Sequence, residues 1–272
     1  MIKWDGHTHS VFCKHGSGED TSILVERAIE LGFQRYSITE HAPLPVQIFN
    51  DKELASEFSL LLEELPDYFK HLNEIKKTYA DKIEVFIGLE LDYIKEFDSY
   101  FDEFLETYLS QLDDIIVSLH MINGKNGVYP IDYSPEWFES ELISYYGSTD
   151  EVHKAYWSDL EHMVSKKINA PIFKRIGHLG LINKYQKQFP PSLPNSFYQS
   201  TYSRLFQAIK EFDWDLDFNV AGLRKELCGS VYINSEMIAL CNKLGIKLVF
   251  GSDAHDAASV GKDYDLYLSQ VS

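Results

Sequence analysis

Two short segments near opposite ends of the chain each carry a pair of side chains that bind metal ions well. His7 and His9 follow the apolar run that opens the chain, and Asp253 and His255 follow the run that ends at Phe250. Side chains two residues apart in an extended strand point to the same face, so each pair can present two ligands to one point. Imidazole and carboxylate ligands suit zinc, manganese or iron. The two segments therefore predict a metal site.

The elements that must carry these residues alternate along the chain. Short β-branched or apolar runs predict seven strands, and most intervals between them have helical periodicity. The predicted strands are 1–7, 34–39, 82–89, 114–119, 172–177, 215–219 and 247–250. The predicted helices are 21–31, 54–79 with an interruption near Pro66, 97–109, 195–211 and 235–244. Such alternation favours a parallel sheet with right-handed crossovers. Seven units in 272 residues favour closure into an α/β barrel.

The predicted barrel brings polar side chains to one end. Those that lie at or just after the C-terminal end of a predicted strand are His7, His9, His41, Glu90, His120, His178, Asp253 and His255. Barrels of this kind carry their active sites at that end. Histidines that follow one strand end after another indicate a common site rather than a scatter of solvated side chains.

The composition disfavours several classes of partner. The chain has 42 acidic and 25 basic residues and a net charge of −17, so its surface repels nucleic-acid phosphates and anionic lipid. No apolar stretch approaches the roughly 20 residues of a membrane span, and the first residues lack the apolar core of a signal peptide. The three cysteines form no CxxC pair, which fits a reducing compartment. We expect a cytoplasmic protein with no nucleic-acid and no membrane partner.

Six motifs occur at the strand ends in a fixed order. They are HTH at 7–9, TEH at 39–41, GLE at 88–90, SLH at 118–120, GH at 177–178 and SDAH at 252–255. This series resembles the polymerase and histidinol phosphatase family over the whole chain. The chain length and the segments EHAP at 40–43, GLELDY at 88–93 and NVAGLRK at 219–225 resemble its histidinol phosphatase branch.

The resemblance implies a fold and a set of metal ligands. The fold is a distorted (β/α)7 TIM-like barrel, which agrees with the seven predicted strands, and we expect one domain over 1–272. The implied cofactors are three divalent metal ions, zinc, manganese or iron. One ion would be held by His7, His9, Glu90 and Asp253, a second by Glu90, His120 and His178, and a third by His15, His41 and His255. All of these positions match.

The resemblance also implies a reaction, the hydrolysis of a small phosphomonoester. The expected substrate is L-histidinol phosphate, hydrolysed to L-histidinol and phosphate in histidine biosynthesis. A hydroxide that bridges metal ions would attack phosphorus, with no phosphoenzyme. Asp253 would orient or deprotonate the nucleophile. His255 and His15 are the candidates to protonate the leaving group, and His15 is also a candidate substrate contact.

Arg224 is the candidate protein cation for the phosphate, with both a binding and a catalytic role. It follows a predicted strand end, and its guanidinium offers a planar fork to phosphate oxygens. A surface ion pair is the alternative. Arg175 could contact the phosphate or form a salt bridge on the outer face of the barrel.

Some neighbouring residues have other expected roles. Glu40 should face away from its neighbour His41, so we interpret it as a support for the site, and we do not count Cys13 among the ligands. The segment at about 121–171 is rich in aromatic and acidic residues and is predicted to be a helical insertion. It either shapes substrate preference or is a helical excursion with its own small core.

Other functions remain open alternatives. A related phosphodiesterase, nuclease or protein tyrosine phosphatase would keep the metal ions and change the ester. A metal-dependent amide hydrolase lacks support, because no lysine of the carbamylated type lies at a predicted strand end. A non-catalytic metal-binding module would be expected to have lost some ligands. The oligomeric state is not predicted.

Overall fold

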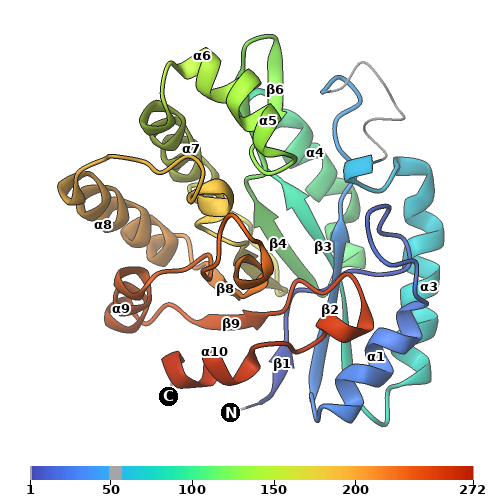
Figure 1. The fold of residues 1–272 in the computed structure, drawn as a ribbon. Coiled ribbons are helices and arrows are strands. Elements are labelled where there is room, and N and C mark those ends of the chain that lie inside the picture. The colour runs from blue at the N-terminus through green and yellow to red at the C-terminus, as the bar shows by residue number, and fades with distance from the viewer. Residues whose placement is uncertain (1, 49–56, 272) are drawn as a thin grey trace.

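Seven parallel strands close into a barrel in the computed structural model, which describes residues 2–48 and 57–271 (Figure 1). In sheet order they are β1 Trp4–Asp5, β2 Arg35–His41, β3 Glu84–Asp92, β4 Asp114–Ser118, β7 Phe173–Ile176, β8 Asp215–Asn219 and β9 Leu248–Gly251. The first and last strands meet, because the Gly6 amide donates to the Phe250 carbonyl at 2.8 Å and the Asp253 amide donates to the His7 carbonyl at 2.8 Å. The predicted barrel is confirmed.

Helices follow most strands and surround the sheet (Figure 1). They are α1 Thr21–Glu30, α3 Leu65–Thr78, α4 Asp98–Tyr108, α5 Pro135–Trp137, α6 Ser144–Tyr146, α7 Thr149–Val164, α8 Asn195–Glu211, α9 Ser235–Leu244 and α10 Tyr264–Val271. Side-chain caps begin α1 and α9, where Asp20 accepts from the Ser22 amide and Asn234 accepts from the Met237 amide.

Two helix predictions need correction. The helix predicted over 54–79, with an interruption near Pro66, begins only at Leu65, where Pro66 lies in the first turn and no amide hydrogen bond is lost; residues 54–56 lie outside the described residues. Helix α10 was not predicted. Within the described ranges, no helix is long and apolar enough to cross a bilayer.

The core lies both inside the barrel and between the barrel and its helices. All five residues of β4 are buried, as expected for a central parallel strand with both faces covered. Helix α7 contributes Tyr156, Trp157 and Leu160, each at most 1% exposed. Full burial of side chains of this size stabilises the fold by about 1.5–3 kcal/mol each. The barrel is therefore a rigid support for the side chains at its rim.

The segment predicted as a helical insertion contains a hairpin as well as helices. Strands β5 Met121–Gly124 and β6 Gly127–Pro130 pair antiparallel, and helices α5, α6 and α7 follow. The sequence analysis missed the hairpin because each strand is only four residues long. Since β5 begins directly after His120, the hairpin stands at the rim that carries the polar side chains.

Arg175 lies inside the barrel, so its interpretation as an outer-face salt bridge is wrong. Its guanidinium donates to Asp114 Oδ2 at 2.7 Å and to the Gly6 carbonyl at 2.6 Å, and it lies 4.9 Å from the centre of the Trp4 ring. Both charged side chains are at most 1% exposed. The pair connects β1, β4 and β7 in a region of low dielectric.

We expect Arg175→Met to lower the free energy of unfolding by about 3–5 kcal/mol, because it leaves the buried Asp114 carboxylate without its charged partner and with only the hydroxyl of Ser37 as a donor. Urea unfolding followed by circular dichroism measures this loss. Arg204→Met is the control, since Arg204 is 57% exposed and its pair with Glu161 lies at the surface. A loss below about 1 kcal/mol for Arg175→Met, the range of a surface pair, would contradict the buried-pair interpretation.

Candidate metal centre

The side chains expected to bind metal come together at the C-terminal rim of the barrel. Three groups have ligand atoms within 4.8 Å of one another and could each hold an ion. The groups are His7, His9 and Asp253; Glu90, His120 and His178; and His9, Cys13, His41 and His255. His15 joins the third group from a loop, with its Nε2 atom 3.2 Å from His255 Nε2. Each group brings enough ligand atoms close together to bind a metal ion.

Glu90 lies at the middle of the cluster. The register of β2 and β3 pairs Glu90 with His41, and His41 Nδ1 lies 3.3 Å from Glu90 Oε2. His7 Nε2 is 3.2 Å from the same oxygen. The other oxygen, Oε1, is 2.8 Å from His178 Nε2 and 3.6 Å from His120 Nε2. The two carboxylate oxygens therefore face different histidines.

The two ligand pairs that opened the sequence analysis lie just beyond their strands. His7 and His9 are both fully buried and lie on the same side of the chain, as the two-residue spacing predicts. The backbone of Thr8, between them, forms a β-bridge with Ala254. Asp253 does not sit in extended backbone, because its φ is 54°. This left-handed conformation is uncommon for a residue other than glycine, although aspartate adopts it more readily than most residues. The turn places Asp253 Oδ1 3.2 Å from His9 Nε2.

Three histidines are oriented by carboxylates behind them. Nδ1 of His7, His9 and His120 lies 2.7, 3.2 and 2.6 Å from a carboxylate oxygen of Asp217, Glu40 and Asp92, respectively. Such a contact fixes the ring and leaves Nε2 to face the cluster. Glu40 is thus a support, as the sequence analysis interpreted it.

Asp217 and Asp92 were missed, although strand alternation offered a signal. Asp92 lies two residues after Glu90 on the same face of β3. Asn219, two residues after Asp217, donates to both Asp217 Oδ2 and Asp253 Oδ2 at 3.1 Å. A Cβ atom at Gly251 would lie 2.1 Å from Asp217 Oδ1, so only glycine lets β9 approach this network.

The charges in the cluster balance one another. Burial favours a neutral Glu90, yet His7 and His120 hold its pKa well below the usual value. Burial likewise disfavours a charged His120, but Asp92 and Glu90 raise its pKa to about 10. Burial, together with the nearby His9, lowers the pKa of His255 to about 3. Positive charge on neighbouring groups therefore keeps the Glu90 carboxylate ionised in spite of its burial.

The donor set fits divalent transition metals. Neutral imidazoles and ionised carboxylates are the forms that bind such ions. Within the described residues, the buried ring atoms His41 Nε2 and His178 Nδ1 have no hydrogen-bond partner. Cys13 fits less well, because burial raises the pKa of its thiol and keeps it protonated.

Arg224 lines the cavity over the cluster and also contacts Asp263 near the surface. Its guanidinium donates to the Ser252 carbonyl at 2.6 Å and lies 3.5 Å from Asp263 Oδ2. It also lines the cavity that holds Asp253 and His255. The ion pair with Asp263 is long, so the guanidinium has donors left for a ligand in this cavity.

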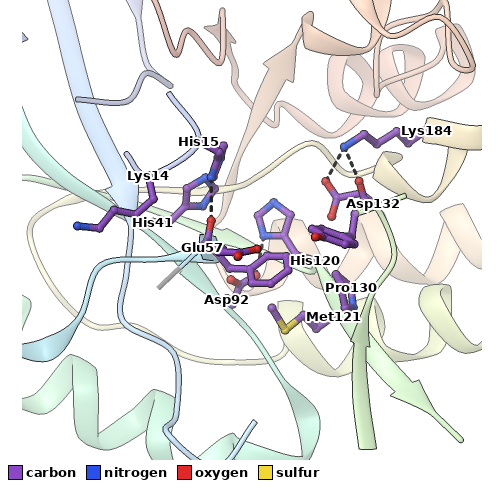
Figure 2. A pocket seen from close by; sticks show the side chains of 12 residues that line it. Lys14, His15, His41, Glu57, Asp92, His120, Met121, Pro130, Asp132 and Lys184 are labelled. Atoms are coloured by element: carbon purple, nitrogen blue, oxygen red, sulfur yellow. Dashed lines mark hydrogen bonds and ion pairs between the residues drawn. The ribbon is translucent and has the colours of Figure 1, made fainter. Parts of the chain in front are cut away.

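Two cavities meet at the cluster. The smaller one has a volume of about 280 Å³ and contains Glu90, His178 and Asp253, and the larger one has a volume of about 530 Å³ and lies beside it (Figure 2). Both are lined by His15, His41, His120, Asp132 and Lys184. A ligand can therefore have one part over the candidate metal ligands and another in the larger cavity.

Comparison with known proteins places these features in a family. The PHP domain model matches residues 5–219. The chain is similar to the histidinol-phosphatase of Bacillus subtilis, with 36% identity over 270 residues that cover 99% of this chain and 100% of that protein. It is also similar to the solved structure of HisK from Listeria monocytogenes, a candidate histidinol phosphatase, with a TM-score of 0.91, 36% identity and coverage of 97% and 100%.

A more distant solved structure has the same fold. It is the histidinol phosphate phosphatase of Lactococcus lactis in complex with zinc, L-histidinol and phosphate, with a TM-score of 0.69 and 22% identity. The match covers 99% of this chain and 94% of that one.

We expect Asp217→Asn to weaken zinc binding by about 10–100-fold, because an amide supports the His7 ring less well than a carboxylate does. Competition with a chromogenic chelator measures the affinity. Asp215→Asn is a matched control on the same strand, where Asp215 faces Lys247 at 3.6 Å away from the cluster. Equal zinc affinity in the two variants would show that Asp217 does not support a ligand.

Proposed function

This chain belongs to the PHP domain family, and from that premise we propose that it hydrolyses L-histidinol phosphate to L-histidinol and phosphate. The observation that carries the proposal is the cluster of histidines around Glu90 at the floor of a cavity. It occurs in a chain that matches the Bacillus subtilis histidinol-phosphatase over 99% of its length. The chain is thus an enzyme of the phosphatase class.

We propose that the centre holds three divalent ions, zinc, manganese or iron. His7, His9, Glu90 and Asp253 would hold the first, Glu90, His120 and His178 the second, and His15, His41 and His255 the third. When bound, such ions bring the pKa of water toward neutrality and offset the charge of phosphoryl oxygens. The zinc in the Lactococcus lactis structure and the three groups of ligand atoms support this assignment.

The protein's own side chains position the reactants. Asp253 would orient the attacking water and accept its proton, because Asn219 fixes its Oδ2 and leaves Oδ1 turned toward the histidines. Arg224 would donate to phosphoryl oxygens from the wall of the smaller cavity. His255 or His15 would supply the proton to the leaving alkoxide only where that side chain is not fully committed to the third ion.

The competing functions have less support. The net charge of −17 disfavours a nuclease, because long nucleic acids need a basic groove. A cavity of about 280 Å³ at the ligands suits a small ester better than a phosphotyrosine on a protein surface. We also propose a cytoplasmic location, supported by free cysteines at 13, 228 and 241.

Chelation is expected to abolish phosphatase activity, and zinc or manganese to restore it. The reactivated enzyme should hydrolyse L-histidinol phosphate with a higher kcat/KM than p-nitrophenyl phosphate, although the latter has the better leaving group, because contacts to the amine and ring act in the transition state. Steady-state kinetics and metal analysis on one batch measure both. Full activity without metal would refute the metal centre, and rates ordered only by leaving-group acidity would refute the substrate.

Glu90→Gln is expected to release or displace two ions and to lower kcat/KM on the order of a thousandfold, because one carboxylate serves both. His178→Gln is the comparison, since it removes one ligand and should cost less. Metal analysis and kinetics of the two variants test the order. Full metal content with near-normal turnover in Glu90→Gln would remove the bridging role.

Arg224→Ala is expected to keep its metal ions, because a guanidinium cannot bind a cation. Its kcat/KM should fall by an amount that corresponds to about 1.5–3 kcal/mol of lost transition-state stabilisation, the value of a charged hydrogen bond. Arg224→Lys should recover only part of this loss. A rise in KM alone would indicate equal binding in the ground and transition states, and a fall in kcat would indicate a role in the transition state. Unchanged kinetics would leave Arg224 only its contacts with Asp263 and the Ser252 carbonyl.

A further inference from the structure

The third group of candidate ligand atoms contains a sulfur. Its ligand atoms lie within 4.8 Å of one another and belong to His9, Cys13, His41 and His255. Resting on the proposed centre of three ions, we infer that the Cys13 sulfur binds the third ion together with His15, His41 and His255. That ion would then be zinc even where manganese fills the other two positions, because a thiolate ligand favours zinc over manganese.

Two imidazoles at this position turn lone pairs toward each other. His255 Nδ1 lies 3.0 Å from the Asp253 carbonyl, and His15 Nδ1 lies 3.2 Å from the Glu57 carbonyl (Figure 2). Because a carbonyl only accepts, each Nδ1 carries the hydrogen, and a neutral ring then has its lone pair on Nε2. The two Nε2 atoms are 3.2 Å apart. Lone pairs this close repel each other, and a cation bound by both nitrogens would remove the repulsion.

His41 contributes a further nitrogen, whereas His9 belongs to another ion. His41 Nδ1 faces Glu90 Oε2 at 3.3 Å, and its buried Nε2 atom has no hydrogen-bond partner among the residues that the structure describes. A buried polar atom without a partner is rare in folded proteins, and an ion at this position would explain it. His9 Nε2 lies 3.2 Å from Asp253 Oδ1, so we assign His9 to the first ion.

The loop that carries Cys13 is fixed at both ends. Ser10 donates from its amide and its hydroxyl to Glu40 Oε2 at 2.9 and 2.7 Å. The Ser17 amide donates to the His255 carbonyl at 3.0 Å, and the Cys13 amide donates to the Ser10 carbonyl at 3.1 Å. Cys13 itself is 7% exposed. The loop therefore holds the sulfur beside the imidazoles and keeps most solvent away from it.

The protonated thiol of Cys13 is the form of the protein without an ion. Burial raises the pKa of this thiol, and for that reason it fits a cation less well than the imidazoles do. An ion that binds the sulfur displaces the proton into solvent, as metal ions do when they bind cysteine. The sequence analysis did not count Cys13 among the ligands, and the closeness of its sulfur to three imidazoles revises that interpretation.

A sulfur ligand also changes what His15 can do. His15 is exposed, whereas Cys13 is buried. With Cys13, His41 and His255 on the ion, three protein ligands remain when His15 leaves it. The His15 ring is then free to act on the leaving alkoxide without loss of the third ion.

Cobalt in place of zinc reports sulfur ligation directly, because a cobalt–thiolate bond gives a charge-transfer absorption in the near ultraviolet. Wild-type protein loaded with cobalt(II) should show this absorption, and Cys13→Ser should lack it. Cys228→Ser and Cys241→Ser are the matched controls, since both cysteines are buried and free and neither belongs to a candidate ligand group of the described residues. Both control variants should keep the absorption.

Metal binding tests the same sulfur without cobalt. Competition with a chromogenic chelator should show that Cys13→Ser weakens zinc binding at one site on the order of tenfold or more. Its manganese affinities should change by less than about twofold, because manganese gains little from a thiolate. His15→Gln should keep all three ions, and the double variant His15→Gln, Cys13→Ser should keep two.

X-ray absorption of the wild-type zinc protein covers the case in which Cys13→Ser does not fold, as judged by circular dichroism. It should show sulfur at about 2.3 Å from zinc beside nitrogen at about 2.0–2.1 Å.

The outcomes separate this inference from the proposed function. Three bound ions with no sulfur signal, or a cobalt absorption that Cys13→Ser retains, would overturn the role of Cys13 and leave the metal centre standing. An active wild-type enzyme that binds only two ions and shows no sulfur signal would overturn the third ion and this inference, while histidinol phosphatase activity would stand. A wild-type protein that binds three ions with a sulfur signal and does not hydrolyse L-histidinol phosphate would refute the proposed substrate and support the role of Cys13.

Discussion

The Glu90 carboxylate is the charge around which the rim of the barrel is organised. It is 1% exposed and faces His7, His41, His120 and His178 from the middle of the cluster. A buried charge of this kind is tolerated only when opposite charges and hydrogen bonds surround it. The Ser118 hydroxyl adds one such bond to Oε1 at 2.6 Å. Protons or metal ions must therefore balance Glu90 in every state of the folded protein.

The support for this cluster extends outward through the strands. Carboxylates of Asp217, Glu40 and Asp92 hold the rings that face Glu90, and Asn219 connects Asp217 to Asp253. These residues come from β2, β3 and β8, and their backbones are fixed by parallel pairing. The precision of the site is thus a property of the whole sheet. The segments between the barrel strands contribute His15, Arg224 and the hairpin, which line the two cavities.

Much of the fold and the ligand set was predictable, because both depend on local patterns. The bounds of α8, β8 and α9 were correct, and polar residues after apolar runs marked the strand ends. Contacts that depend on strand register were missed: Asp217 behind His7 is separated from it by 210 residues. The left-handed turn at Asp253 and the burial of Arg175 inside the barrel have no signal in periodicity. The hairpin was too short to show alternation.

Closure of the barrel between β1 and β9 has a consequence for how the protein is made. His7 and His9 leave the ribosome well before Asp253, on which their candidate ligand group depends, because Asp253 follows His9 by 244 residues. The group of Glu90, His120 and His178 is complete much earlier in the chain. The nascent polypeptide can therefore complete its candidate ligand groups only one after the other. A chain released before β9 is made would contain Glu90, His120 and His178 but would lack Asp253. The imidazoles of His7 and His9 would then lack this carboxylate and could bind other cations in the cell.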